Sequence, residues 1–159
     1  MKIKYQDDFL SNFEYENIFD YCLNANYGYG ERDNTDTPVT GMVHQIPVTE
    51  LIYQTLSTKI EEKCSFLSEM NLYRMYVNCF APNENPYFHT DGESGITFLY
   101  YLNEKYNIQD GGETQFLLDG DIYGVMPVSN RLVMFDANIL HRATSFRDRH
   151  RFTIAIKYD

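Results

Sequence analysis

A histidine and an aspartate two positions apart, His89 and Asp91, are the residues of this chain best suited to chemistry. In an extended strand, side chains at positions i and i+2 point to the same side, so this imidazole and carboxylate can approach one ion together. A third ligand must then come from elsewhere in the chain. Because a lone His-x-Asp pair is often only a hydrogen-bonded surface pair, other residues of the chain must support a metal-binding interpretation.

The third ligand has few candidates, since the chain contains only four histidines. One of them, His141, closely follows an apolar run at 131–135 that is typical of a buried strand. Two histidines and one carboxylate on one face of a metal leave positions open for cosubstrate and O₂, as in non-haem iron(II) oxygenases. His89, Asp91 and His141 are therefore the candidate metal ligands.

Arg151 opens the last apolar run of the chain, ten residues after the final candidate ligand. Strand alternation places Arg151, Thr153 and Ala155 on one face. A guanidinium buried there needs an anionic partner, and its planar fork suits a carboxylate bound through two hydrogen bonds. The alternative is that Arg151 is one more exposed residue of the basic cluster that includes Arg147 and Arg149. Its position on a strand face separates Arg151 from that cluster.

Two helices are expected to support these residues. Ser11, with Glu14 three residues later, predicts a capped helix that ends before 27–30, and a second helix should begin near 49–50. The side chains expected on the buried stripes are Phe13, Ile18, Phe19, Cys22 and Leu23, then Leu51, Ile52, Leu56, Ile60 and Cys64. The polar connection 28–47 is predicted to be a mobile lid or a loop with one short strand at 41–46. His44 lies in it and is expected to contact substrate or simply to pack.

After residue 71 the apolar period changes to two. Short runs rich in β-branched and aromatic residues, separated by turn residues, predict strands at 72–80, 96–102, 114–118, 122–125, 131–135 and 152–158. Helices followed by many short strands indicate an α+β fold whose second part is a β-sandwich or jelly roll. We expect one domain over 1–159, with 1–70 as supporting helices and connection and 71–159 as the catalytic core.

Five short motifs resemble, in their order, the 2-oxoglutarate- and iron(II)-dependent dioxygenases, most closely the prolyl 4-hydroxylase branch. These motifs are His89-Thr90-Asp91, Tyr100-Tyr101-Leu102-Asn103, Gly111-Gly112-Glu113-Thr114, His141 and Arg151. The resemblance covers about 71–159 and implies a double-stranded β-helix (jelly-roll) core buttressed by the N-terminal helices. One motif alone would be weak, but five in order are specific.

The resemblance also implies residue roles. The three candidate ligands would bind Fe(II), and Arg151 would hold the distal carboxylate of 2-oxoglutarate. Tyr101 would donate its hydroxyl to that carboxylate, with Leu99 on the same strand face; the alternative for Tyr101 is a core aromatic. The family often has a tyrosine where this chain has Phe80, and Tyr76 and Asn78 on the same face are the candidates to compensate and to contact substrate.

The implied reaction uses O₂ and converts 2-oxoglutarate to succinate and CO₂ while it hydroxylates an unactivated C–H bond, with ascorbate expected as a reductant. The carboxylate of Asp91 favours hydroxylation, because related halogenases lack it. The expected substrate is a prolyl residue in a peptide or protein. The alternatives are a free amino acid or other small metabolite, a dealkylating oxygenase of nucleic-acid repair, and a non-catalytic metal-bearing β-sandwich that serves as a binding module.

The composition of the chain limits the classes of molecule that it is expected to bind. The formal charge of −10, from 23 acids and 13 bases, argues against nucleic acid and anionic membranes as partners. A repair enzyme would also need a second arginine after Arg151, and only Tyr158 and Asp159 follow Lys157. Three widely spaced cysteines indicate reduced thiols, and no apolar run reaches membrane-spanning length. We therefore expect a soluble, cytoplasmic protein.

Overall fold

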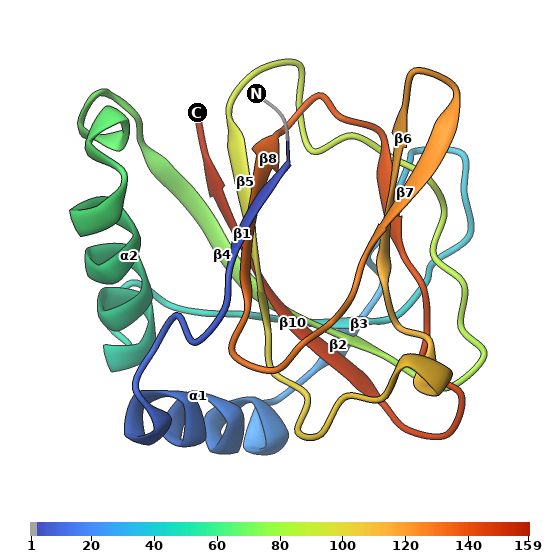
Figure 1. The fold of residues 1–159 in the computed structure, drawn as a ribbon, viewed down its shortest axis with the longest axis horizontal. Helices are drawn as coiled ribbons and strands as arrows, with labels where there is room; N and C mark the ends of the chain where they lie inside the picture. Colours follow the sequence, from blue (N-terminus) through green and yellow to red (C-terminus); the bar gives the residue numbers. More distant parts are fainter. Residues whose placement is uncertain (1–2) are drawn as a thin grey trace.

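The computed structural model describes residues 3–159 as two facing antiparallel β-sheets with two helices against the outer face of the larger one (Figure 1). The helices are α1 (Asn12–Asn24) and α2 (Leu51–Lys63). The strands are β1 (Lys4–Gln6), β2 (Gly28–Tyr29), β3 (Met42–Gln45), β4 (Leu72–Phe80), β5 (Ile96–Tyr101), β6 (Thr114–Leu118), β7 (Asp121–Val125), β8 (Leu132–Asp136), β9 (His141–Ala143) and β10 (Arg151–Tyr158).

The larger sheet has the order β1-β8-β5-β10-β4-β3-β2, and the smaller has the order β7-β6-β9. The last strand of the chain, β10, lies at the centre of the larger sheet, with Thr153 opposite Tyr101 of β5 and Asn78 of β4. Arg151 at the start of β10 is thereby held inside the sheet. The two sheets and the helices confirm the predicted α+β jelly-roll class.

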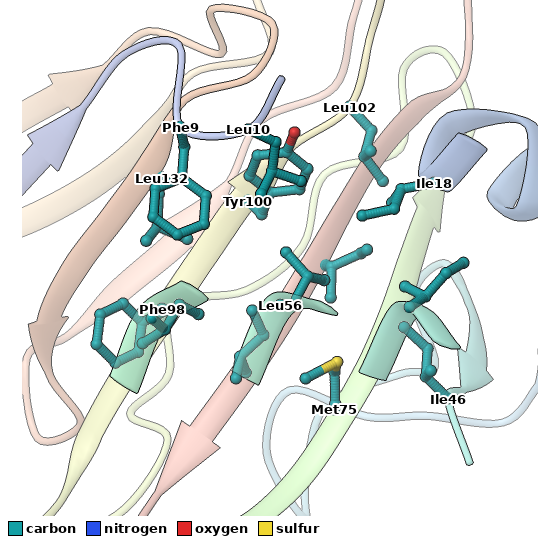
Figure 2. Packing of buried hydrophobic residues seen from close by; sticks show 14 of the residues in the cluster. Phe9, Leu10, Ile18, Ile46, Leu56, Met75, Phe98, Tyr100, Leu102 and Leu132 are labelled. Carbon is teal, nitrogen blue, oxygen red and sulfur yellow. The ribbon is translucent and has the colours of Figure 1, made fainter. Parts of the chain in front are cut away.

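Strand alternation divides the core into two layers. One face of the larger sheet packs against α1 and α2, and Figure 2 shows Leu56, Ile18 and Phe98 in this layer. Full burial of such a side chain contributes about 1.5–3 kcal/mol to folding. The other face meets the smaller sheet through a second cluster that includes Leu99, Tyr101 and Phe116. The candidate site lies on this second face, so the helices support the sheet from behind the site.

The first helix begins as predicted, because Ser11 and Glu14 form a complete capping box. The predicted apolar stripes were partly wrong: Phe13, Leu23 and Leu51 are 74%, 52% and 75% exposed. Phe13 and Leu23 each lie five residues from the buried Ile18, a rotation of about 140° around a helix, and Leu51 has the same relation to the buried Leu56. These side chains therefore point away from the sheet.

The predicted strand within 28–47 is confirmed as β3, which pairs with β4. Strands β1, β2 and β9 were not predicted, because elements of two or three residues carry too little periodicity to be recognised. The segment 1–70 therefore supplies sheet-edge strands as well as supporting helices.

Candidate metal centre

The candidate ligands His89 and His141 are brought together by the backbone. An isolated antiparallel bridge joins them, with each backbone N–H donating to the other residue's carbonyl at 2.9 Å. Two residues on, the N–H of Asp91 donates to the carbonyl of Ala137 at 2.8 Å. The segment containing His89 and Asp91 is thus fixed against the chain that leads into β9. As a result, His89 and Asp91 share one side of the cavity with the distant His141.

The side chains present the atoms that a metal requires. The Nδ1 atoms of His89 and His141 lie 3.0 and 2.9 Å from the carbonyls of Tyr87 and Ile139. Since a carbonyl only accepts hydrogen bonds, each Nδ1 carries the proton and each Nε2 keeps its lone pair for a metal. The Nε2 atoms lie 3.7 Å (His89) and 3.6 Å (His141) from the carboxylate oxygens of Asp91. These separations are too long for hydrogen bonds but suit three ligands of one ion.

The electrostatics favour the metal-binding protonation states. Burial lowers the pKa of His141 to about 4, so its imidazole is neutral near pH 7. Burial opposes the charge on Asp91, but His141, Lys157 and Thr97 outweigh it and the pKa of Asp91 is lowered from its ordinary value. Thr97 Oγ1 donates to one oxygen of Asp91 at 2.7 Å, and Lys157 Nζ lies 2.7 Å from the other. The donor set therefore fits Fe(II), with a neutral imidazole and an ionised carboxylate in place.

The low pKa of His141 predicts a pH-dependent stability. In the unfolded chain a histidine binds its proton near pH 6.5, whereas folded His141 binds it only near pH 4. Between these values the unfolded state binds more protons, so the free energy of unfolding should fall by about 3 kcal/mol as the pH is lowered through this window. Urea unfolding of the metal-free protein at pH 7 and pH 4.5 tests this. The pH dependence should be shallower in His141→Gln, and an equal dependence in both proteins would contradict the assignment.

Arg151 forms the second half of the site. Its side chain is 1% exposed, and its hydrogen bonds go to the carbonyl of Gly112 at 2.8 Å and the hydroxyls of Thr114 and Thr153 at 2.9 and 3.4 Å. The Tyr101 hydroxyl donates to the same Thr114 oxygen at 2.6 Å. All three acceptors of Arg151 are neutral, and a guanidinium has five N–H donors, so Arg151 retains donors for a carboxylate.

One cavity connects the metal ligands with Arg151. Among the sequence-predicted residues, its lining includes Leu99, Tyr76, Asn78 and Phe80. Tyr101 reaches this end of the site through its bond to Thr114. The structure does not bring His44 to the cavity: its Nε2 lies 2.8 Å from the Tyr21 hydroxyl and its Nδ1 3.0 Å from the Asn26 carbonyl. Of the two roles expected for His44, contact with substrate or packing, the structure shows packing.

The connection 28–47 forms one wall of the cavity. Asp33 accepts a hydrogen bond from the backbone N–H of Tyr87 at 2.8 Å, and its second oxygen lies 3.4 Å from His89 Nδ1. Asn34 donates to the carbonyl of Phe88 at 3.0 Å. These contacts join the connection to the segment that carries the first metal ligand. Movement of this wall as a lid stays a prediction.

Several site residues were not recognised from sequence, among them Thr97, Thr114, Thr153 and Lys157. Thr114 belongs to the Gly-Gly-Glu-Thr motif, yet its part as the shared partner of Arg151 and Tyr101 needs the β6–β10 geometry. Lys157 had a usable signal, because it lies six residues after Arg151 and therefore on the same face of β10. It lines the cavity together with the metal ligands.

Comparisons with known proteins agree with this site. The family model described as the 2OG-Fe(II) oxygenase superfamily matches residues 73–158, more than half of the chain. A prolyl-4-hydroxylase from Pseudomonas putida superimposes with a TM-score of 0.76 at 19% identity, covering 98% of this chain and 91% of its own. A prolyl hydroxylase from Trichoplax adhaerens, in complex with a peptide fragment of hypoxia inducible factor, gives 0.82 at 18% identity, covering 98% and 82%.

A third similar structure is HygX from Streptomyces hygroscopicus with nickel and 2-oxoglutarate bound, with a TM-score of 0.75 at 9% identity, covering 98% of this chain and 82% of its own. No curated protein matches the chain significantly. Among residues 3–159, neither helix has the length and apolar character needed to cross a membrane.

Proposed function

Because the chain belongs to the 2OG-Fe(II) oxygenase superfamily, we propose that it hydroxylates an unactivated C–H bond, with a prolyl residue of a peptide or protein as the first candidate substrate. The observation that carries the proposal is the buried Arg151, whose three acceptors are neutral, on the same cavity as two histidines and an aspartate. A module that only bound a metal would gain nothing from burying a guanidinium without an anion.

Fe(II) and 2-oxoglutarate, when bound, supply the oxidising chemistry with O₂ and leave succinate and CO₂ as products. The protein's own part is to hold and orient them. His89, Asp91 and His141 would hold the metal, and the carbonyls of Tyr87 and Ile139 fix the two imidazoles in the ligating tautomer.

At the other end of the cavity, Arg151 would bind the distal carboxylate of the cosubstrate, with Thr114 between Arg151 and the Tyr101 hydroxyl. Tyr101 is expected to turn its hydroxyl from Thr114 to this carboxylate. Leu99 and Ala155 line the cavity between the two ends and help to keep this stretch dry. Ascorbate as a reductant and a cytoplasmic location remain part of the proposal; the free thiols Cys22, Cys64 and Cys79 suit a reducing compartment.

Two of the similar structures are prolyl hydroxylases, which supports a prolyl substrate. A free amino acid or other small metabolite is the second candidate. HygX has been crystallised with hygromycin B bound, so this fold also accommodates small molecules. The observation that supports this second candidate is the charged lining of the present cavity, which includes Glu31, Arg74 and Lys157.

The test is 2-oxoglutarate turnover by the purified protein supplied with Fe(II) and O₂. Proline-containing peptides and free amino acids should be screened for stimulated succinate formation and for a mass gain of one oxygen atom. Protein that binds iron and still gives no succinate, with or without these compounds, would contradict the proposed reaction. Stimulation by one class only would identify the substrate class.

A further inference from the structure

Lys157 is a buried cation beside the metal ligands that the reaction itself does not require. Its side chain is 10% exposed, and its Nζ lies 2.7 Å from Asp91 Oδ1 and 5.3 Å from the centroid of the Tyr76 ring. Because Lys157 is the last cavity-facing residue of β10, it lies at the end of the strand remote from Arg151. An ammonium has three donors, and the pair with Asp91 and the hydrogen bond with Tyr76 leave one of them for a further acceptor.

The ionic partners of the charged groups in the loaded site show how Lys157 differs from the others. In the loaded site, Fe(II) and 2-oxoglutarate would cancel each other, and Arg151 would cancel Asp91. The remaining charged residues of the cavity lining are Glu31, Arg32, Asp33 and Arg74, whose charges also cancel, and Lys157. Lys157 differs from these groups, because its carboxylate partner, Asp91, would be shared with the metal. A buried ammonium that shares its carboxylate partner with a metal is stabilised by a second acceptor, such as the carboxylate of a bound molecule.

The entrance offers groups of the opposite sign. Arg74 Nη2 lies 2.7 Å from Glu31 Oε1, and its guanidinium covers the Tyr76 ring at 4.0 Å. The side chains of Arg74 and Glu31 are 28% and 39% exposed, so this pair borders the cavity at its outer side. Glu31 can therefore receive a cationic group of a bound molecule at little cost, because it belongs to a partly solvated pair.

We propose that Lys157 binds the carboxylate of the substrate, and that the substrate is a free amino acid. This inference rests on the proposed function, whose reaction it keeps. It selects the second candidate substrate over the first: free proline is admitted, whereas a prolyl residue inside a peptide chain brings no carboxylate into the cavity. Lys157 is thus a specificity-determining residue, and its contact with Asp91 places the bound carboxylate close to the reacting metal.

The experiment compares each free L-amino acid with its amide, and both with capped tripeptides that contain proline, aspartate or glutamate. Succinate formation and the mass gain of the added compound are measured. At least one free amino acid should stimulate turnover, with kcat/KM about tenfold to a hundredfold above that of its amide, the effect of one hydrogen bond to a charged group. Isothermal titration with Fe(II) and 2-oxoglutarate in the absence of O₂ should give the same preference in binding.

Lys157→Met should reduce the ratio of acid to amide towards one, and Lys157→Arg should retain the preference. Lys59→Met is the matched control, since Lys59 is 40% exposed on α2 and pairs with Glu14; its ratio should equal that of the unaltered protein. The ratio is independent of any general loss of activity, and the unaltered protein alone tests the preference if Lys157→Met fails to fold.

Several results would overturn the inference: stimulation by capped peptides alone, equal activity on acid and amide, an unchanged ratio in Lys157→Met, or no stimulation by any free amino acid. Capped peptides that work only with aspartate or glutamate would assign Lys157 to a side-chain carboxylate instead. Failure of the proposed function is distinguishable, because the unaltered protein would then also fail to bind 2-oxoglutarate at its iron.

Discussion

His141→Ala should abolish iron-dependent turnover. His141 supplies one of three ligands, and its Nδ1 is fixed by the Ile139 carbonyl so that its Nε2 faces Asp91 at 3.6 Å. Removal of the imidazole leaves His89 and Asp91, which cannot complete the ligand set. A loss of several kcal/mol of transition-state stabilisation corresponds to a decrease in turnover of about a thousandfold or more.

The measurement is succinate formation at saturating 2-oxoglutarate, with iron content determined on the same preparation. His141 packs against Phe135 at a ring-centroid distance of 4.7 Å, so circular dichroism must first show that the variant is folded. His150→Ala is the matched control, because His150 is exposed and outside the cavity lining. A folded His141→Ala protein with undiminished succinate production would remove His141 from the metal site.

Arg151→Ala should weaken 2-oxoglutarate binding by about 2–5 kcal/mol, which is a loss of roughly thirtyfold to several thousandfold in affinity. The guanidinium is fully buried, and none of its hydrogen bonds goes to a carboxylate. The cosubstrate would be its anionic partner, and without Arg151 the distal carboxylate would be buried unpaired.

Anaerobic titration of the iron-loaded protein with 2-oxoglutarate measures this affinity directly. Iron binding itself should change little, because Arg151 contacts none of the three ligands. Arg147→Ala is the matched control, since Arg147 is exposed and outside the cavity lining. An unchanged affinity in a folded Arg151→Ala protein would mean that another cation holds the cosubstrate.

The sequence was sufficient to predict the elements that have a regular hydrophobic period or a local capping motif. Strand β4 and strand β6 have the predicted bounds, and Ser11 caps the first helix as expected. Alternation also placed Arg151 and Leu99 correctly on the cavity face, because a strand has only two faces to choose between. The ligand set could be proposed because so few histidines exist and because the motifs occur in a family's order.

Other features depend on contacts between distant segments, which periodicity does not report. The burial of Ile18 but not of Phe13 depends on which side of α1 meets the sheet. The orientation of His44 towards Tyr21 depends on the register of β3 against β4. The pairing of Lys157 with Asp91 joins the end of β10 to a loop, and only the folded chain shows it.

The packing of Phe80 could not be predicted from sequence for the same reason. From sequence it was only a departure from the usual tyrosine. In the structure its ring packs against Gly41, where an added Cβ would lie 2.5 Å from a ring carbon. Gly41 has φ +69°, a conformation that favours glycine. Phe80 therefore helps to seat β3 beside β4, a contact that no local pattern indicates.

The most direct test of the central claim is anaerobic optical titration of the purified protein with Fe(II) and then 2-oxoglutarate. This measurement needs no knowledge of the substrate, since chelation of the cosubstrate at iron(II) produces a visible charge-transfer band. We expect the band in the unaltered protein and its loss in Asp91→Ala. Iron bound at His89, Asp91 and His141 without any band on addition of 2-oxoglutarate would contradict the oxygenase assignment and favour a metal-binding module.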